Sequence, residues 1–494
     1  MTKLPLVIKN SLKSKTDELQ NLKRSYNHMI IESFCIQRME LLKHLKNFSP
    51  STIEFKFLRI FDESMSQIFL NSNENITKLV FHKCDLPRFT SPSTLNSLKS
   101  LSVSATGWRI LNMFPLCKNI QELKINGPPF RSGTWRDDEQ YLTAFMTGQE
   151  KLETLIIPCY FPLDINTMID AKYNLKQLTV CQHLNLLSAQ DEIEKRNFAN
   201  RYENAHTRTR YEINDDENVI ETNAWLLQII ARHKDSLENL EICVRGENLM
   251  EFIMENLKVR RLFITADLLP TNCQVFIKTQ PNLHLKELII CRKIRNSEAL
   301  QGLIRTYPKI ESLIIKNVQE DVINETLIVI ANTLENLKLL HLHKVTFNTP
   351  DAPMPSLRTF KVEIINGIKD FLTFCFNIPS IEHLAVKWLP ARLTIGFIQI
   401  MTSRLPQLKR IKLGYEFELT SEILEIFSSN CPQLRLIEIL NNKHKARSNV
   451  THGKIEVVYF AQCFTEHVFK EGRTLRCDSG DVLISYAQAD LPNV

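Results

Sequence analysis

The sequence predicts an α/β fold in which a strand–loop–helix unit repeats along most of the chain. Three observations indicate this: a six-residue apolar pattern recurs, amphipathic stretches separate its copies, and prolines precede several copies at a fixed position. The chain has 494 residues, which exceeds the usual size of a single compact core. A repeat array accounts for this length without requiring several unrelated cores.

The recurring pattern is apolar-x-x-apolar-x-apolar, and most copies begin 20 to 27 residues after the previous one. A weaker leading copy, IEFKF, begins at residue 53. The clear copies are ITKLVF at 76, LKSLSV at 98, IQELKI at 120, LETLII at 152, LKQLTV at 175, LENLEI at 237, VRRLFI at 259, LKELII at 285, IESLII at 310, LKLLHL at 337, LRTFKV at 357, IEHLAV at 381, LKRIKL at 408 and LRLIEI at 434.

Each copy is predicted to be a short strand, because its last four residues alternate between apolar and variable types. The stretches between copies, such as residues 325–334 and 421–430, carry apolar residues at helical spacing. One unit cannot cover its own apolar face, so neighbouring units must stack. We therefore predict a curved leucine-rich-repeat solenoid with a parallel concave sheet and a helical convex side.

Proline marks the boundary between helix and strand. Pro308, Pro355, Pro379, Pro406 and Pro432 each stand two residues before the first apolar residue of a copy. Proline lacks an N–H group and has a fixed φ, so it ends the preceding helix and favours an extended segment.

Segments such as Asn430-Cys431-Pro432-Gln433-Leu434, with a looser version at residues 404–408, are similar to the repeats of F-box/leucine-rich-repeat proteins. The N-terminus resembles a shortened, degenerate F-box, in which Leu4-Pro5 begins the module and residues 17–30 form its closing helix. Val7 departs from the family pattern, and Tyr26 stands where the family usually has tryptophan. The resemblance implies that Leu4, Pro5, Ile8, Leu12, Leu22, Tyr26 and Ile30 bind the adaptor of an SCF-type ubiquitin ligase, which would also bring the cullin scaffold. The alternative is a helical cap on the open end of the solenoid.

The chain is expected to have three parts: residues 1–45 as the F-box-like helical segment or cap, 46–442 as the solenoid, and 443–494 as a C-terminal capping segment. A charged stretch of mixed sign at about 188–222 is expected to be an insertion from one repeat. Residues 454–460 and 481–487 are predicted strands of the cap.

A partner site is predicted on the concave face, where the residue between the last two apolar positions points away from the core. Phe263, Ile289 and Ile314 form an apolar stripe in this column, and His341 follows. Lys361 and Lys412, flanked by Lys387 and Arg410, form a basic shoulder. This arrangement favours a protein partner with an apolar anchor and acidic flanks. The alternative is that these residues suit strands, or that a loop covers the stripe.

No catalytic chemistry is predicted, because the sequence has no Gly-rich phosphate loop, HExxH or GxSxG motif, and no cofactor or metal is expected. No apolar run reaches the roughly 18 residues of a membrane span, so a cytoplasmic or nuclear location is expected. The net charge of +6 comes from interleaved acids and bases, which gives no specific support for nucleic-acid binding.

The predicted function is protein recognition, with the chain as a substrate receptor that presents a bound client to an SCF-type ubiquitin ligase. The alternative is a non-catalytic scaffold or inhibitor that uses the same face without docking to a ligase. The two differ in whether residues 1–45 bind the adaptor.

Overall fold

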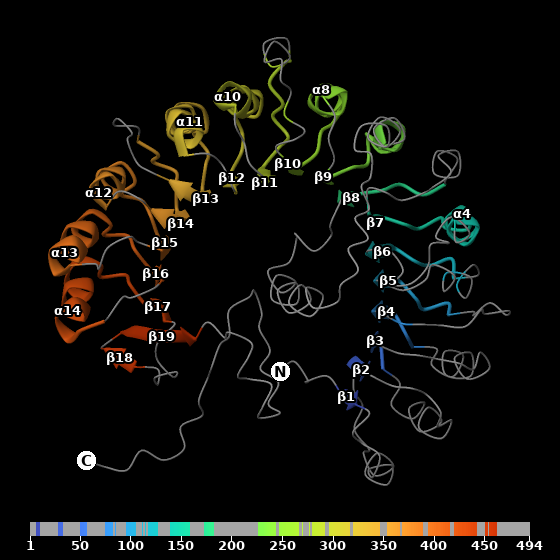
Figure 1. Ribbon diagram of the computed structural model, residues 1–494, viewed down its shortest axis with the longest axis horizontal. Helices are drawn as coiled ribbons and strands as arrows, with labels where there is room; N and C mark the ends of the chain where they lie inside the picture. The colour runs from blue at the N-terminus through green and yellow to red at the C-terminus, as the bar shows by residue number, and fades with distance from the viewer. Residues whose placement is uncertain are drawn as a thin grey trace, which may run out of the picture. The chain divides into compact units, whose positions relative to one another are not determined.

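A computed structural model shows an α/β chain (Figure 1). Its residues divide into two compact units. The N-terminal unit comprises Met1–Leu184 and Asn214–Val244, and the C-terminal unit comprises Asn185–Ile213 and Arg245–Val494. The structure describes residues 6–9, 28–32, 50–56, 75–82, 84, 95–104, 111, 114, 117–126, 139–158, 172–181, 226–243, 247–265, 269, 276, 279–291, 296–316, 320–345, 353–365, 368–388, 394–414, 419–441, 450–452 and 454–461.

In the N-terminal unit, the strands pair in chain order and all pairs are parallel. The strands are β1 (Leu6–Lys9), β2 (His28–Glu32), β3 (Thr52–Lys56), β4 (Lys78–His82), β5 (Ser100–Ser104), β6 (Glu122–Asn126), β7 (Thr154–Pro158), β8 (Gln177–Cys181) and β9 (Asn239–Cys243). Its described helices are α4 (Glu139–Thr147) and residues 226–233.

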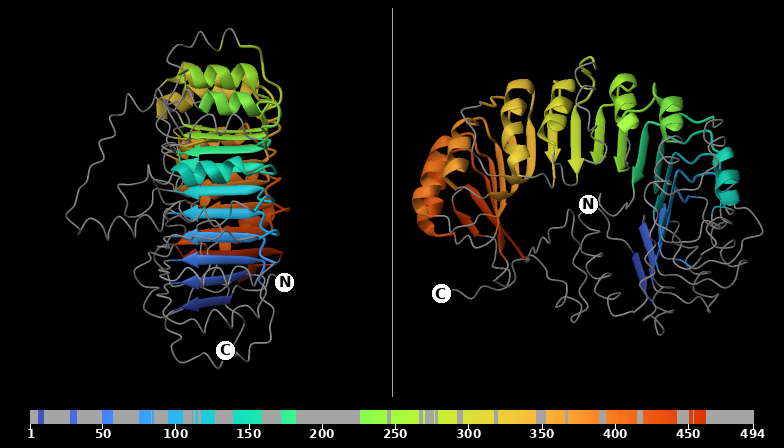
Figure 2. Two further views of the ribbon diagram at one scale, coloured as in Figure 1. Left: turned by 90° about the vertical axis from the view of Figure 1, so that its right-hand side faces the viewer. Right: turned by 45° about the horizontal axis from the view of Figure 1, so that its top comes forward.

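In the C-terminal unit, β10 to β17 also pair in chain order and in parallel. The strands are β10 (Arg261–Thr265), β11 (Glu287–Cys291), β12 (Ser312–Ile315), β13 (Leu339–Val345), β14 (Thr359–Ile365), β15 (His383–Trp388), β16 (Arg410–Leu413), β17 (Leu436–Asn441), β18 (Val450–His452) and β19 (Ile455–Ala461). The helices are α8 (Glu247–Asn256), α10 (Ser297–Thr306), α11 (Glu320–Thr333), α12 (Ile368–Phe376), α13 (Ile395–Arg404) and α14 (Ser421–Asn430). They lie on one side of the sheet (Figures 1 and 2).

The strands bury alternate side chains, as the sequence pattern predicts. In β4, Leu79 and Phe81 are buried between half-buried neighbours, and in β16 the same alternation buries Ile411 and Leu413. The helices supply the facing apolar layer, for example Leu300, Leu303 and Ile304 of α10. Stacked leucine and isoleucine side chains therefore form the core between the sheet and its helices.

The helices end where the prolines predict. Three helices end two residues before a proline. α10 ends at Thr306 before Pro308, α13 at Arg404 before Pro406, and α14 at Asn430 before Pro432. A turn follows at each proline, and the next strand begins a few residues later. The starts of these helices are capped by Asn296, Thr394 and Thr420, whose side chains accept a hydrogen bond from the backbone N–H three residues on.

The predicted helical N-terminal region is wrong for the residues that the structure describes there. Ile8 lies in β1 and Ile30 lies in β2, and these strands pair with each other in parallel. β2 in turn pairs with β3 with Met29 opposite Ile53, and both of these side chains are fully buried. The physical reason is that Met29 lies in register with the buried Ile53 and Leu79 of the next two strands. Burial of its side chain therefore favours a strand at residues 28–32.

At the other end, β19 confirms the strand predicted at 454–460 and pairs in parallel with β17. The short strand β18 adds to β19 in the antiparallel direction. The parallel stack thus continues beyond the boundary predicted at residue 442. The insertion predicted at about 188–222 and the strand predicted at 481–487 lie outside the described residues.

We predict that Gly302→Ala lowers the free energy of unfolding by about 1 to 3 kcal/mol. Gly302 lies in α10, and a Cβ atom there would stand 2.5 Å from Cδ2 and 2.6 Å from Cγ of Phe276, so the ring must move. Gly396→Ala in α13 is the matched control, because a Cβ there meets nothing within 4 Å. Alanine should leave stability unchanged or raise it by up to about 1 kcal/mol at that site. Urea unfolding checks both, and equal stability of the two variants would contradict the packing argument.

Candidate partner-binding face

The predicted partner-binding residues lie in one row on the sheet of the C-terminal unit. Phe263 of β10 is opposite Ile289 of β11, Ile289 is opposite Ile314 of β12, and the row continues through His341 to Lys361. Ala385 of β15 and Lys412 of β16 extend it, and Glu438 of β17 stands beside Lys412. We call this set of residues the face row.

The predicted exposure of the apolar stripe is wrong for two of its three members. Phe263 is 5% exposed and Ile289 is 7% exposed, whereas Ile314 is half-buried. Side chains in register on neighbouring strands stand about 5 Å apart, so Phe263 and Ile314 on either side hide part of the surface of Ile289. The sequence pattern identifies the face on which a side chain lies, but it does not show what covers that side chain. Ile314 is therefore the member of the stripe that offers apolar contact.

The basic shoulder lies at the other end of the face row. Lys361 is exposed and Lys412 is half-buried. Arg410, which is exposed and lies two residues before Lys412 on β16, donates from Nε to Oε2 of Glu438 at 2.6 Å. Glu438 is 4% exposed, so its buried carboxylate holds the guanidinium at the sheet surface. Lys387 lies on the neighbouring strand β15.

His383 of β15 reports the electrostatic environment of this shoulder. Its pKa lies below the usual value, first because partial burial disfavours the charged ring. The positive charges of Arg410, Lys409 and Lys361 lower the pKa further, and Glu382 opposes them. A fourth positive charge is thus disfavoured among these three cations, which indicates a surface that attracts anions.

A second row of charged residues lies where the strands of this unit begin, and the sequence analysis missed it. Each member is the second residue of its apolar pattern, three residues before the face row. The members are Arg260, Lys286, Glu311, Lys338, Arg358, Glu382, Lys409 and Arg435. We call this set of residues the edge row. The signal was present in the sequence, because the second position of each copy is occupied by a charged residue from 259 onward.

Backbone hydrogen bonds hold the edge row in line. The carbonyl of Arg358 accepts from the amides of Glu382 and His383 at 2.8 and 2.9 Å. The carbonyl of Glu382 accepts in the same way from Lys409 and Arg410 at 2.7 and 3.0 Å. The same two-to-one pattern recurs at Lys286, Glu311, Lys338 and Lys409, and it fixes the spacing of the side chains.

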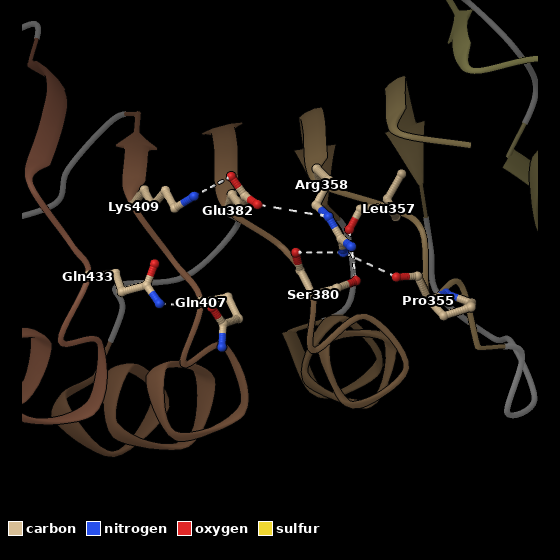
Figure 3. Close-up of polar contacts among 8 residues, drawn as sticks. All are labelled: Pro355, Leu357, Arg358, Ser380, Glu382, Gln407, Lys409 and Gln433. Carbon is tan, nitrogen blue, oxygen red and sulfur yellow. Dashed lines mark hydrogen bonds and ion pairs between the residues drawn. The ribbon is translucent and has the colours of Figure 1, made fainter. Parts of the chain in front are cut away.

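Each carboxylate of the edge row lies between two cations. Glu311 contacts Nζ of Lys286 at 2.9 Å and Nζ of Lys338 at 2.7 Å. Glu382 contacts Nζ of Lys409 at 2.7 Å and Nε of Arg358 at 3.8 Å (Figure 3). Hydrogen bonds from Lys338 and Lys286 lower the pKa of Glu311 to about 2, although partial burial opposes the shift.

Arg358 is positioned by more than this ion pair. Its Nη1 donates to the carbonyls of Pro355 at 3.1 Å and Ser380 at 3.3 Å, and the Ser380 hydroxyl donates to the carbonyl of Leu357 at 2.9 Å (Figure 3). The guanidinium is therefore held across two neighbouring repeats, which reduces the entropy that it would lose on binding a partner.

Four of the described cysteines, Cys84, Cys117, Cys375 and Cys431, are buried. Burial raises the pKa of Cys117 to about 11 and that of Cys431 to about 12, and it also raises the pKa of Cys375. Such thiols remain protonated and are poor nucleophiles. Within the part of the chain that the structure describes, no three His, Cys, Asp or Glu residues gather as metal ligands do. No helix among the described residues has the length and apolar character needed to cross a bilayer.

No protein-family model matches this chain, and a search of curated proteins finds no match either. The functional inference therefore depends on the face row and the edge row.

We predict that Glu311→Gln lowers the free energy of unfolding at pH 7 by up to about 1 kcal/mol, since the carboxylate is partly exposed. The pKa of Glu311 is about 2 in the folded protein and near 4.5 ordinarily, so its stabilising effect is full above about pH 4.5. The effect is lost as the pH falls from 4.5 towards 2. The difference between wild type and variant should therefore narrow across this window, as measured by urea unfolding at several pH values. Glu425→Gln, on the exposed surface of α14, is the control. A gap that stays constant across the window would contradict the assignment.

Proposed function

We propose that this chain is a leucine-rich-repeat protein that binds a protein partner on the face row of its C-terminal unit. The repeat assignment is supported by the parallel strands, the helices on one side of the sheet and the strand spacing of 20 to 27 residues in this unit. The observation that carries the binding proposal is the chemical gradient along the face row. It changes from apolar at Ile314 to basic at Lys361 and Lys412 over consecutive strands in register.

The partner that fits this gradient is a protein segment with an apolar side chain for Ile314 and acidic residues for the basic shoulder. An apolar anchor supplies affinity through burial, and charge complementarity supplies orientation and association rate. The chain acts by holding its partner and performs no reaction on it.

Docking to an SCF-type ubiquitin ligase through residues 1–45 stays a second proposal, because Leu4, Pro5 and Tyr26 resemble an F-box. Leu4, Pro5, Leu12, Leu22 and Tyr26 lie outside the described residues, and Ile8 and Ile30 lie in strands. Since an F-box is a helical module, β1 and β2 favour the scaffold or inhibitor function over the substrate receptor.

The binding proposal is tested by affinity capture under cross-linking with the variant Ile314→Thr/Lys361→Glu. Threonine keeps the β-branched shape that suits a strand, so the fold should persist while the anchor and one charge are lost. The control Ile400→Thr/Lys309→Glu makes the same changes at exposed positions on α13 and after α10. We expect at least one captured protein to fall roughly tenfold with the face variant and to be retained by the control. Equal recovery of every captured protein by both variants would remove the face row as the site.

The ligase proposal is tested by capture with the intact chain and with Leu4→Ala/Pro5→Ala/Tyr26→Ala, quantifying the SCF adaptor and the cullin scaffold. The ligase proposal expects the intact chain to enrich both proteins and the triple variant to lose them. Enrichment of neither protein would remove this proposal and leave the scaffold or inhibitor function, which the strands β1 and β2 favour.

A further inference from the structure

The edge row of the C-terminal unit has a regular order of charge. From Arg260 on the first repeat to Arg435 on the last, two cations are followed by one carboxylate, and this order repeats. The carboxylates, Glu311 and Glu382, thus stand three strands apart and separate three pairs of cations: Arg260 with Lys286, Lys338 with Arg358, and Lys409 with Arg435.

The spacing of this pattern follows from the sheet. Neighbouring strands lie about 4.8 Å apart, so a three-strand repeat spans about 14 Å. The hydrogen bonds from each repeat to the carbonyl of the preceding edge-row residue keep this spacing along the row. The pairs of cations in the edge row therefore recur at a fixed interval of about 14 Å.

The cations are what a partner would meet. The side chains of Lys286, Lys338, Arg358 and Lys409 are 42 to 63% exposed, whereas the carboxylates of Glu311 and Glu382 are 32% and 30% exposed. Each carboxylate lies between cations that reach further into solvent. The row has six cations and two acids, so it keeps a net positive charge after its internal ion pairs form.

We propose that the edge row binds an extended acidic polypeptide that runs across the strands with an acidic side chain at every fourth residue. An extended chain advances about 3.4 Å per residue, so four residues span about 14 Å and return the side chain to the same face. A helical segment advances only about 1.5 Å per residue and would need nine or ten residues for each period. This inference rests on the proposed function, because it specifies the acidic flanks of the partner.

A nucleic acid fits the row less well. Its backbone carries a negative charge at every nucleotide, which would place phosphates against Glu311 and Glu382 as well as against the cations. A peptide can instead place uncharged residues beside the two carboxylates. The two carboxylates therefore favour a peptide whose acidic residues are spaced to avoid them, and they also hold the lysines in line.

The test measures binding of two fluorescent 13-residue peptides to the full chain by anisotropy at low salt. Both contain three glutamates in a Ser/Thr/Gly background, at positions 3, 7 and 11 in one peptide and at positions 6, 7 and 8 in the other. We expect the spaced peptide to bind about fivefold more tightly. Lys338→Gln/Arg435→Gln should weaken its binding by between four- and twenty-five-fold, that is two- to five-fold for each cation lost. Lys172→Gln/Lys234→Gln, at exposed positions in the N-terminal unit, is the control of equal charge and should change nothing.

A second variant separates ligand binding from a purely structural role. Glu311→Gln/Glu382→Gln removes the two carboxylates that punctuate the row, so both peptides should bind more tightly and the preference for the spaced peptide should disappear. Circular dichroism and the unfolding temperature verify that each variant is folded. If the ion pairs of the edge row served only to join repeats, this variant would lose stability without altering the ratio of the two affinities.

Three results would overturn the inference: equal affinity for the two peptides, no loss in Lys338→Gln/Arg435→Gln, or tighter binding of a single-stranded 13-mer oligonucleotide that the same variant abolishes. These results are distinguishable from failure of the proposed function, because that function is tested separately, by protein capture with the face-row variant Ile314→Thr/Lys361→Glu. Loss of captured protein in that variant together with equal peptide affinities would leave the face-row proposal standing and remove the edge-row inference.

Discussion

The hydrogen bonds between successive strand beginnings are the constraint on which the rest of the structure depends. In repeat after repeat, the carbonyl of the second pattern residue accepts two amides from the next repeat, as at Arg358 and Glu382. One carbonyl that serves two donors fixes both the position and the direction of the incoming strand. Register then propagates along each sheet, so residues at the same pattern position are brought side by side whatever their type.

This enforced alignment has an electrostatic consequence. Two unit charges about 4 Å apart in water interact by roughly 1 kcal/mol, so a row made of cations alone would repel itself at every step. Glu311 and Glu382 replace repulsion by attraction on both sides, and the hydrogen bonds and charges of Lys338 and Lys286 lower the pKa of Glu311. The remaining cation pairs keep the net positive charge, which the stack tolerates because these side chains extend into water.

The sequence was sufficient for the parts of the fold that repeat with a full pattern. The apolar columns of β3 to β17 and the prolines at helix ends follow directly from it. β1, β2 and β19 were missed as repeats because the sequence has no aliphatic residue three positions before their first inward residue, where Lys3, Tyr26 and Lys454 stand. β3 has Pro50 at this position and was recognised only as a weaker copy. Backbone pairing and the buried Met29 and Val457 suffice to add these strands.

The exposure of side chains could not be predicted in the same way, since the burial of Phe263 and Ile289 depends on their surroundings in three dimensions. The edge row was overlooked because the second position of the apolar pattern varies between copies and was not compared from one copy to the next.

The two rows differ in how they can distinguish partners. The face row changes its chemistry along its length, so the partner that we propose for it is defined by the order of its apolar and acidic groups. The edge row repeats its chemistry, so the peptide that we propose for it is defined by the interval between its acidic groups. A segment that binds both rows must place an apolar side chain on the face row and acidic side chains at the interval of the edge row. A segment that fails in either leaves an apolar side chain or a cation of this chain without a contact. Discrimination of this kind comes mostly from what a wrong partner fails to satisfy. A stack of nearly identical units can therefore be selective even though each unit contributes only one or two contacts.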